Sequence, residues 1–432
     1  MPSGLEFNLA PERLDEGSPE EQAAFGLFTI RAGNLALTEG FDCFISALRP
    51  GPLVSGYHAA EWFAWNWWRL RYEPFSRHAT DWWRAHKMTA IGEGYVWPNI
   101  TFDTDGVRAD IYSDASANPE ARPFRYLGAR PWHGPATGLE EAIDAFVPSI
   151  IARAQDPGLR DSNLERVWSD VLAERRDPSI AEQRRLEALL GRDPDEVDAS
   201  IIQALLDDGA QLGVSAIDEL AADATDARPL SAARLRDIAA REGIEARRAD
   251  AVRLAPEDLA EARLQPLAWQ QGRHAARALR AREALGAAPI STLRLSHLLG
   301  VSPDGHGKPI FASPLSFLLD EQKDCARVVL RSRWETGQRF ELARLLGDNL
   351  IFGQDAPMLP ATRAYTFRQQ AQRSFAAEFL CPFEAVQDML QGDFSPEAME
   401  EVADHFTVSP MTVDTLLRNK GLIEREPMAE AA

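Results

Sequence analysis

The chain has 432 residues, of which 45% are apolar, and it carries a formal net charge of −20. Its length and composition fit a globular protein of several domains, and the acidic balance argues against wholesale wrapping of nucleic acid. The sequence has no apolar run near the roughly 18 residues of a membrane span and no signal-peptide pattern, so we expect a cytoplasmic protein without membrane contact. Its three cysteines stand far apart, which argues against a disulfide scaffold and a thiolate zinc site.

Residues 1–155 are expected to form a tryptophan-rich α+β domain with a small β-sheet and helices. Strand-forming residues cluster or alternate over 25–37 and 95–114, and the second stretch contains Thr-Asp-Gly where a hairpin should turn. The stretch 58–73 has no helix breaker and predicts one helix that is apolar around much of its circumference. A further helix is predicted over 138–155.

Residues 156–264 are expected to connect the two ends of the chain as a helical array. From about 156 to 300 the strand signal disappears, and short amphipathic helices follow one another. Several of them start at Ser, Asp or Asn and stop at Gly. No fixed repeat period is present in the sequence, so a solenoid is not predicted. The small, acidic and proline residues of 223–230 mark the best internal boundary.

The C-terminal part returns briefly to β structure before it becomes helical again. Two apolar segments within 309–333 flank a polar turn, and they predict a hairpin that leads into a helix capped by Thr336. Further helices are predicted over 368–382 and within 400–421, where two helices have helix-turn-helix spacing. The last residues, 426–432, are expected to be disordered.

Three segments in this order carry a resemblance to a known family. They read RFELARLLGD (339–348), SFAAEFLCP (374–382) and ADHFTVSPMTVDTLLRNKGLI (403–423). Together they resemble the core of the ImmA/IrrE family of metallopeptidases, here over residues 265–425 and fused to an uncharacterised tryptophan-rich N-terminal domain. The resemblance implies a mostly helical, zincin-like core with a small β-hairpin or sheet. It also implies a role in stress response or in the control of mobile elements and phages, where family members act on repressors or antitoxins.

The residues that would hold zinc in this family are replaced. The resemblance implies an H-E-x-x-H motif. Its two histidine positions are occupied here by Arg344 and Asp348, and its glutamate position is occupied by Leu345. A further acidic ligand would come from just before Phe375, where residues 369–372 read QQAQ. Zinc lowers the pKa of bound water from about 15.7 to about 7, so a chain that cannot hold the ion cannot make hydroxide near neutral pH. We therefore expect no catalytic residue, no metal and no cofactor.

Arg344 and Asp348 stand four residues apart and share one helix face, which leaves two interpretations. In the first, they form a solvated ion pair that lines an abandoned cleft. In the second, the guanidinium of Arg344 fills the position of the metal, and the cleft serves to recognise a peptide or an anionic group. A fixed positive charge at this position would also repel a divalent metal.

A second candidate binding site lies in the N-terminal domain. Trp62, Trp65 and Trp68 have the spacing of a stripe along one helix face, and Arg69 and Arg71 follow directly. In one interpretation the rings are the core of a small domain, since tryptophan is highly buried on average. In the other, the rings and the two arginines form an aromatic and cationic pocket for a nucleobase, a peptide or a modified side chain.

These observations favour a catalytically silent pseudopeptidase that works as an intracellular regulatory or protein-binding module. Its partner would be a repressor, an antitoxin or a similar protein. One alternative is an active metallo-endopeptidase with an unconventional site. The other is a DNA-binding transcriptional regulator that uses 400–421 or the stretch 228–282, which holds twelve arginines against seven acidic residues.

Overall fold

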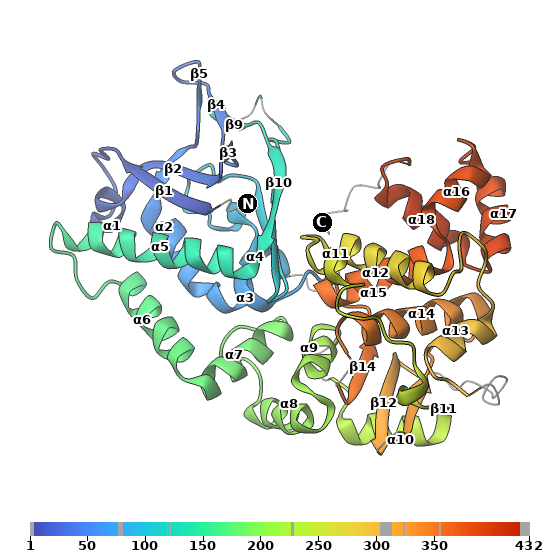
Figure 1. The fold of residues 1–432 in the computed structure, drawn as a ribbon. Coiled ribbons are helices and arrows are strands. Elements are labelled where there is room, and N and C mark those ends of the chain that lie inside the picture. Colours follow the sequence, from blue (N-terminus) through green and yellow to red (C-terminus); the bar gives the residue numbers. More distant parts are fainter. Residues whose placement is uncertain are drawn as a thin grey trace. The chain divides into compact units, whose positions relative to one another are not determined.

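The computed structural model shows two compact units, Met1–Ile202 and Gln203–Ala432, and each is described by itself (Figure 1). Both units combine helices with small antiparallel sheets, so the α+β class predicted from the sequence is confirmed. The division between the units falls inside the predicted helical region 156–264 and before 223–230. The predicted tail 426–432 lies outside the described residues. The structure describes residues 4–76, 81–118, 120, 122–225, 229–302, 313–322, 325–353 and 356–423.

The described residues of the first unit form three small antiparallel sheets and a set of helices. Its strands are β1 (Leu5–Pro11), β2 (Phe25–Ala32), β3 (Leu35–Ala36), β4 (Gly40–Asp42), β5 (Ala47–Arg49), β6 (Leu53–Ser55), β7 (Ile100–Thr104), β8 (Arg108–Ser113), β9 (Phe124–Tyr126) and β10 (Ala129–Pro135). Its helices are α1 (Pro19–Ala23), α2 (Gly56–Trp65), α3 (Trp67–Tyr72), α4 (Trp82–His86), the 3₁₀ helix η1 (Met88–Ala90), α5 (Ala136–Gln155), α6 (Asn163–Arg176) and α7 (Pro178–Leu189). In the sheets, β2 pairs with β1, β3 and β6, β8 lies between β10 and β7, and β4 lies between β5 and β9.

The hairpin predicted at Thr-Asp-Gly is confirmed as the β7–β8 pair. Thr104 pairs with Ala109 at the end of the ladder. In the turn, the Asp105 carboxylate accepts hydrogen bonds from the backbone nitrogens of Val107 and Arg108, at 3.0 and 2.8 Å. Gly106 has a φ of +84°, a conformation that glycine adopts without strain. The local chemistry of this turn explains why the sequence alone could place it.

The core of the first unit is built from aromatic rings on four different elements. The ring of Phe7 on β1 stacks on Phe63 of α2, with 5.0 Å between the centroids. Its edges meet Phe102 of β7 and Phe146 of α5 at 6.1 and 6.2 Å. Burying one such side chain stabilises a fold by about 1.5–3 kcal/mol, so this cluster holds two sheets and two helices together.

The single helix predicted over 58–73 is in fact two helices, α2 and α3. Asn66 stands between them with φ −99° and ψ 11°, and its side-chain amide donates to the carbonyl of Trp62 at 2.8 Å. Asparagine competes in this way with the helical hydrogen bonds, which the apolar pattern did not reveal. The break places Trp68 on a different helix from Trp62 and Trp65, and within α2 Trp62 is buried while Trp65 is 58% exposed.

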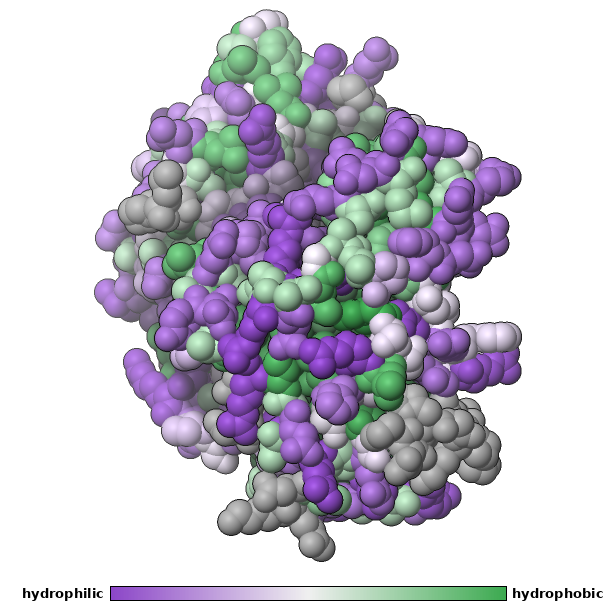
Figure 2. All heavy atoms as spheres, turned by 45° about the vertical axis from the view of Figure 1, so that its right-hand side comes forward, coloured by the Kyte–Doolittle hydropathy of each residue, from purple (hydrophilic) through white to green (hydrophobic). Residues whose placement is uncertain are grey.

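The hairpin formed by β4 and β5 carries exposed apolar side chains. Phe44 and Ile45 lie in the turn and are 86% and 52% exposed, and Leu48 on β5 is 61% exposed. The Asp42 carboxylate accepts a hydrogen bond from the backbone nitrogen of Phe44 at 3.0 Å, which shapes the turn. Figure 2 shows hydrophobic surface at the top, where this hairpin lies in Figure 1.

The second unit is mostly helical over its described residues, which also form a four-stranded antiparallel sheet. Its strands are β11 (Ile244–Ala246), β12 (Ser316–Gln322), β13 (Cys325–Val329) and β14 (Met358–Ala361). Its helices are α8 (Ala199–Leu212, which begins just before the division), α9 (Val214–Ala222), α10 (Ala232–Glu242), the 3₁₀ helix η3 (Arg248–Asp250), α11 (Ala260–Arg263), α12 (Ala268–Arg282), α13 (Thr292–Leu298), α14 (Glu335–Ile351), α15 (Phe367–Leu380), α16 (Phe383–Leu390), α17 (Pro396–Phe406) and α18 (Pro410–Asn419). The strand order is β11-β13-β12-β14.

The hairpin predicted within 309–333 is confirmed as β12 and β13, which pair from Phe317–Val329 onward. The sheet also has two strands that the sequence did not predict. The three residues of β11 are too few to show an alternating pattern, and β14 follows Pro357 and contains Pro360, a residue type that is disfavoured in strands. The predicted cap at Thr336 is wrong, because α14 begins at Glu335. The hydroxyl of Ser332 accepts a hydrogen bond from the backbone nitrogen of Trp334 at 3.2 Å and turns the chain before that point.

Helices α12, α14 and α15 pack unusually closely. A Cβ atom added at Gly272 of α12 would lie 2.1 Å from the carbonyl oxygen of Ala371 on α15. A Cβ atom added at Gly347 of α14 would lie 2.6 Å from the ring of Phe375, also on α15. Because real Cβ atoms do not approach so near, both glycines are needed for this packing.

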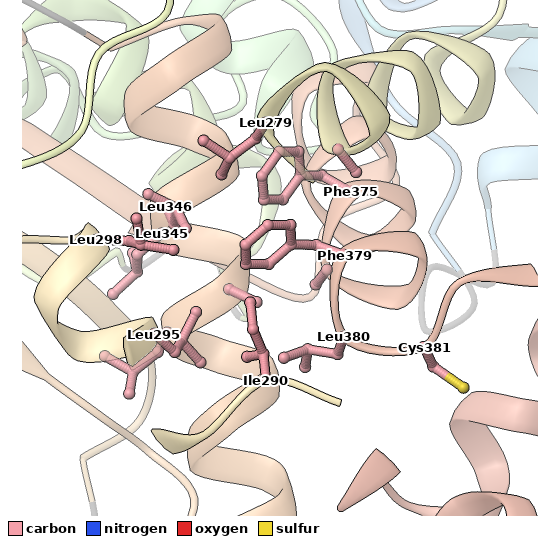
Figure 3. Close-up of a cluster of buried hydrophobic side chains, with 14 of the residues drawn as sticks. Leu279, Ile290, Leu295, Leu298, Leu345, Leu346, Phe375, Phe379, Leu380 and Cys381 are labelled. Carbon is pink, nitrogen blue, oxygen red and sulfur yellow. The ribbon is translucent and has the colours of Figure 1, made fainter. Parts of the chain in front are cut away.

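The space between these helices is filled by apolar side chains. Figure 3 shows Phe375 and Phe379 of α15 pointing toward Leu345 and Leu346 of α14, with Leu279 of α12 beside them. The two phenylalanine rings stack with their centroids 5.3 Å apart. All five side chains belong to the hydrophobic core of the second unit.

The close packing predicts that Gly272→Ala destabilises the protein by at least about 2 kcal/mol, although alanine is the better helix former by about 1 kcal/mol. Gly209→Ala in α8 is the matched control, because the nearest atom to its added Cβ is 3.7 Å away. Urea unfolding should show the first variant less stable than the parent and the second slightly more stable. Equal stability of the two variants would contradict the close approach of α12 and α15.

Candidate functional site

The positions of α14 that the predicted resemblance aligns with the zinc motif are buried, because α15 and β14 pack against this helix. Arg344 is 5% exposed, and Leu345 and Asp348 are fully buried. Leu345 is a packing residue of the hydrophobic core (Figure 3). Arg344 and Asp348 each make their contacts with other residues. Their interpretation as a solvated ion pair is therefore wrong.

The guanidinium of Arg344 faces two glutamine side chains of α15. Its Nη2 atom donates hydrogen bonds to the Oε1 atoms of Gln369 and Gln372 and to the carbonyl oxygen of Thr362, the last at 2.7 Å. The amide nitrogens of both glutamines donate to the carbonyl oxygen of Pro360, at 3.1 and 3.0 Å. This shared acceptor turns both amide oxygens toward Arg344.

The contacts of Arg344 are nevertheless incomplete. Its Nε atom is buried and has no hydrogen-bond partner among the described residues. Burial, and next the charge of Arg373, lower the pKa of Arg344 to about 9, which still leaves the guanidinium protonated at neutral pH. A buried cation that has only neutral partners is costly for folding.

Asp348 is neutralised by a residue that sequence reasoning missed. Both of its carboxylate oxygens accept hydrogen bonds from Arg368 of α15, from Nε at 2.7 Å and from Nη2 at 2.6 Å. The Nη1 atom of Arg368 also donates to the hydroxyl of Ser215 on α9, at 3.2 Å. This forked geometry is the strong form of an arginine–carboxylate pair.

A buried carboxylate on α9 completes the polar cluster around α15. Glu219 accepts a hydrogen bond from the hydroxyl of Thr366, with oxygen–oxygen distances of 2.7 and 3.0 Å to its two carboxylate atoms. Burial raises the pKa of Glu219 to about 7, against the opposing charge of Arg368. Glu219 lies 147 residues before Thr366 in the chain, so no local sequence signal could have placed it here.

Two further arginines lie near Arg344. Arg373 of α15 donates to the carbonyl of Ala364 at 2.6 Å and makes no ion pair with a carboxylate of the described residues. Arg331, just after β13, pairs with Glu341 of α14 at 3.4 Å. Both side chains are partly exposed, whereas Arg344 is buried, so the arginine cluster extends from the interior to the surface.

The oxygen atoms that face this cluster are already in use. Both oxygens of Asp348 accept from Arg368, and the Oε1 atom of Gln369 accepts from Arg344 and from the backbone nitrogen of Thr362. Among the described residues, no group of three His, Cys, Asp or Glu side chains is arranged to hold a metal ion. The arrangement suits the binding of an anion better than the binding of a cation.

The residues of the tryptophan-rich segment do not form the pocket proposed from the sequence. Trp62 and Arg69 are buried inside the first unit, and Trp65 presents its ring to solvent. Arg71 donates from Nε to the carboxylate of Glu140 at 2.8 Å. Most of the rings therefore serve as core, because α2, α3, β1 and β7 meet there.

A buried polar network in the first unit was not predicted from the sequence. Arg69 contacts Glu73 with two hydrogen bonds, at 2.6 and 3.0 Å. His86 places Nε2 2.9 Å from Glu73 and Nδ1 2.7 Å from the carbonyl of Phe102, and its ring stacks on Trp82. Both ring nitrogens of His86 therefore face oxygen atoms inside the unit. The spacing of Arg69 and Glu73, four apart on one helix, is the signal that could have revealed their pair.

The helix-turn-helix segment is used mainly for packing. Ser409 caps α18 by accepting a hydrogen bond from the backbone nitrogen of Thr412, and buried residues of α17 and α18 join the core of the second unit. The basic side chains at the end of α18 have partners inside the chain. Arg418 pairs with Asp414 at 2.7 Å, and the Lys420 ammonium lies 4.6 Å above the ring of Phe383.

Five arginines of the stretch 228–282 form ion pairs within the second unit. The ion pairs include Arg234–Asp237, Arg241–Asp237, Arg248–Asp320, Arg277–Glu378 and Arg282–Asp258. The buried Arg280 donates from all three guanidinium nitrogens to backbone carbonyls. These contacts occupy six of the arginines that binding to a phosphate backbone could otherwise use.

Comparison with known proteins found no matching family model, no matching curated protein and no matching solved structure. The resemblance to the ImmA/IrrE family therefore stays a prediction from the three sequence segments. In the described parts of the chain, no helix has the length and apolar character needed to cross a bilayer.

The two α14 residues should respond differently to substitution. Asp348→Asn leaves Arg368 buried without its counter-charge, and we expect it to lower the free energy of unfolding by about 3 kcal/mol or more. Arg344→Met removes a buried cation that has no carboxylate in contact. We expect it to lower the free energy of unfolding by less than about 1 kcal/mol. Urea unfolding at neutral pH measures both. Similar losses for the two variants would show that Arg344 is as well compensated as Asp348.

Glu219 should make the stability of the protein depend on pH. Its pKa in the folded state is about 7, above its ordinary value of 4.5, so the folded state binds more protons than the unfolded state between these values. Stability should therefore fall as pH rises from 4.5 to 7, by at most about 3 kcal/mol, and the penalty should persist at higher pH.

The variant Glu219→Gln removes this titration while keeping an acceptor for Thr366. We expect it to match the parent at pH 4.5 and to exceed the parent in stability at pH 8. Urea unfolding curves at the two pH values give the comparison. If the free energies of unfolding of parent and variant differ by the same amount at both pH values, the titration of Glu219 does not cause the pH dependence of stability.

Proposed function

We propose that this chain is a catalytically silent protein of the ImmA/IrrE type that acts inside the cell as a regulatory module and binds another protein. Stress response or the control of mobile elements is the proposed setting, and a repressor or antitoxin is the proposed kind of partner. Both follow from the sequence resemblance. A location in the cytoplasm agrees with the three cysteines, which are unpaired.

One observation carries the proposal. Where the resemblance expects the first zinc-binding histidine, Arg344 donates hydrogen bonds to Gln369 and Gln372, which stand near the position of the expected acidic ligand. At the second histidine position, both oxygens of Asp348 are held by Arg368. A zinc site needs free lone pairs on three or four ligand atoms, and these side chains do not offer them.

The exposed apolar residues of the β4–β5 hairpin support a role in protein binding. Phe44, Ile45 and Leu48 leave most of their side-chain surface in solvent, as described above. Apolar side chains that gather on the surface in one place mark protein contact sites more often than single ones do.

Purification of the tagged full chain from its native host, with mass spectrometry of the bound proteins and elemental analysis, tests the proposal. We expect one partner that is retained in the presence of a chelator, without stoichiometric zinc. The partner is then purified and mixed with the chain, and its intact mass should stay unchanged after prolonged incubation. Arg344→Gln should weaken the complex, while Arg333→Gln, which removes an exposed arginine nearby, should not.

Two results would contradict this proposal. One zinc ion per chain, together with chelator-sensitive cleavage of the partner, would show an active peptidase. Failure of the purified partner to bind the chain in the absence of other cell components would show that the capture was indirect. Circular dichroism of each variant confirms that its fold is intact.

A further inference from the structure

Lysine is rare in this chain, and one lysine follows helix α18 directly. Four of the 46 basic residues are lysines: Lys87, Lys308, Lys323 and Lys420. A guanidinium stays protonated in proteins, whereas a lysine amine can lose its proton and become a nucleophile. Lys87 and Lys420 belong to the described residues, and Lys420 is the C-cap residue of α18. Chemistry that needs an amine side chain therefore has few places to occur in this protein.

The ammonium of Lys420 lies over two aromatic rings. Its Nζ atom is 4.6 Å from the ring centroid of Phe383 on α16 and 5.8 Å from the ring centroid of Trp269 on α12. Within the described parts of the chain, this nitrogen donates no hydrogen bond and forms no ion pair. No hydrogen bond to these residues has to break before the amine loses its proton.

Four charged side chains on three neighbouring helices act on Lys420. Arg273 and Arg277 of α12 disfavour its charged form, while Glu378 of α15 and Glu384 of α16 favour it. Both carboxylates are already engaged by Arg277, from Nε to Glu378 at 2.7 Å and from Nη2 to Glu384 at 3.0 Å. Burial, and next the charge of Arg273, lower the pKa of Lys420. A larger share of this amine is therefore neutral than in an ordinary lysine.

Lys87 in the first unit provides an internal comparison. It is the C-cap residue of α4, is partly exposed like Lys420, and lies 5.5 Å from the ring centroid of Trp83. A contact between a cation and a ring stabilises the charged form, and it is present at both lysines. A higher reactivity of Lys420 would thus have to come from its other neighbours, of which Arg273 and Arg277 act in that direction.

We propose that Lys420 is a modification site that takes an acyl group from an activated donor, an acyl phosphate or an acyl thioester. The neutral amine attacks the acyl carbon, and a carbon–nitrogen bond forms. The bond from that carbon to the phosphate oxygen or to the thiol sulfur breaks, and its electron pair leaves with the phosphate or the thiolate. The amine proton passes to water, so the step needs no oxidant or reductant.

Acylation changes the charge at the end of the helix pair α17–α18. The product is a neutral amide, so the cation over the two rings is lost together with its repulsion by the two arginines. Arg277 keeps its contacts with Glu378 and Glu384, so the change leaves neither carboxylate without a cation. The site can therefore switch its charge at little cost to the buried acid Glu378. This inference goes beyond the proposed function, because it uses neither a protein partner nor the positions of the zinc motif.

Acylation of the full chain with acetyl phosphate and, separately, with acetyl-coenzyme A tests the proposal. Peptide mass spectrometry gives the rates at Lys420 and Lys87 in the same sample, so decay of the donor cancels in their ratio. We expect Lys420 to react at least about twofold faster than Lys87 at pH 8. The ratio should fall at pH 10.5, because a growing share of both amines is neutral there.

Substitutions in α12 test the physical cause. Arg273→Gln removes a charge that opposes the ammonium, and Arg277→Gln frees two carboxylates that favour it, so both should lower the ratio at pH 8. Arg282→Gln is the matched control, because it removes a positive charge from the same helix outside the groups that act on Lys420. Circular dichroism shows whether each variant keeps its fold.

Three results would overturn the assignment of Lys420. The first is that neither donor modifies it faster than Lys87. The second is a ratio that stays the same at both pH values, which would show that exposure alone decides the rates. The third is that both Arg273→Gln and Arg277→Gln keep the ratio of the parent. The donor that gives the higher ratio identifies the source of the acyl group, and a failure here leaves the proposed binding function untouched.

Discussion

The polar cluster of the second unit depends on the close approach of α12 and α14 to α15. Gly272 and Gly347 remove the side chains that would otherwise hold these helices apart. Because α14 lies so near to α15, Arg344 and Asp348 come within hydrogen-bond distance of Gln369, Gln372 and Arg368. The same approach encloses Leu345 between apolar side chains (Figure 3). Packing and polar contacts are thus consequences of one steric condition, the absence of two Cβ atoms.

The two buried charges of α14 play different parts in this cluster. Asp348 is fully compensated by Arg368, so it contributes to stability as long as both partners are present. Arg344 has no such partner, and the structure bears the desolvation of its charge without a matching gain. A residue that weakens the fold while it keeps unused donors is typical of a binding site, where stability and function oppose each other.

Those features that depend on local chemistry could be predicted from the sequence. The turn at Asp105 and Gly106 was found because its residues are the ones that such a turn requires, and the β12–β13 hairpin and most central helices followed from periodicity. The break at Asn66 and the strand β11 were missed, since a single side-chain hydrogen bond and three residues leave no periodic trace. The tryptophan-rich segment was recognised as notable, yet its rings are mostly core, because burial depends on what packs against the helix.

By itself the sequence determined that the zinc motif of the resembled family is absent, since ligand chemistry follows from side-chain identity at Arg344, Leu345 and Asp348. It also determined that Arg344 and Asp348 share a helix face, because helical spacing requires it. Only the tertiary structure decided that they do not pair with each other. The choice of partner depends on which atoms a distant segment brings within about 3 Å, and here α15 and α9 bring Arg368, Gln369 and Glu219 to the cluster.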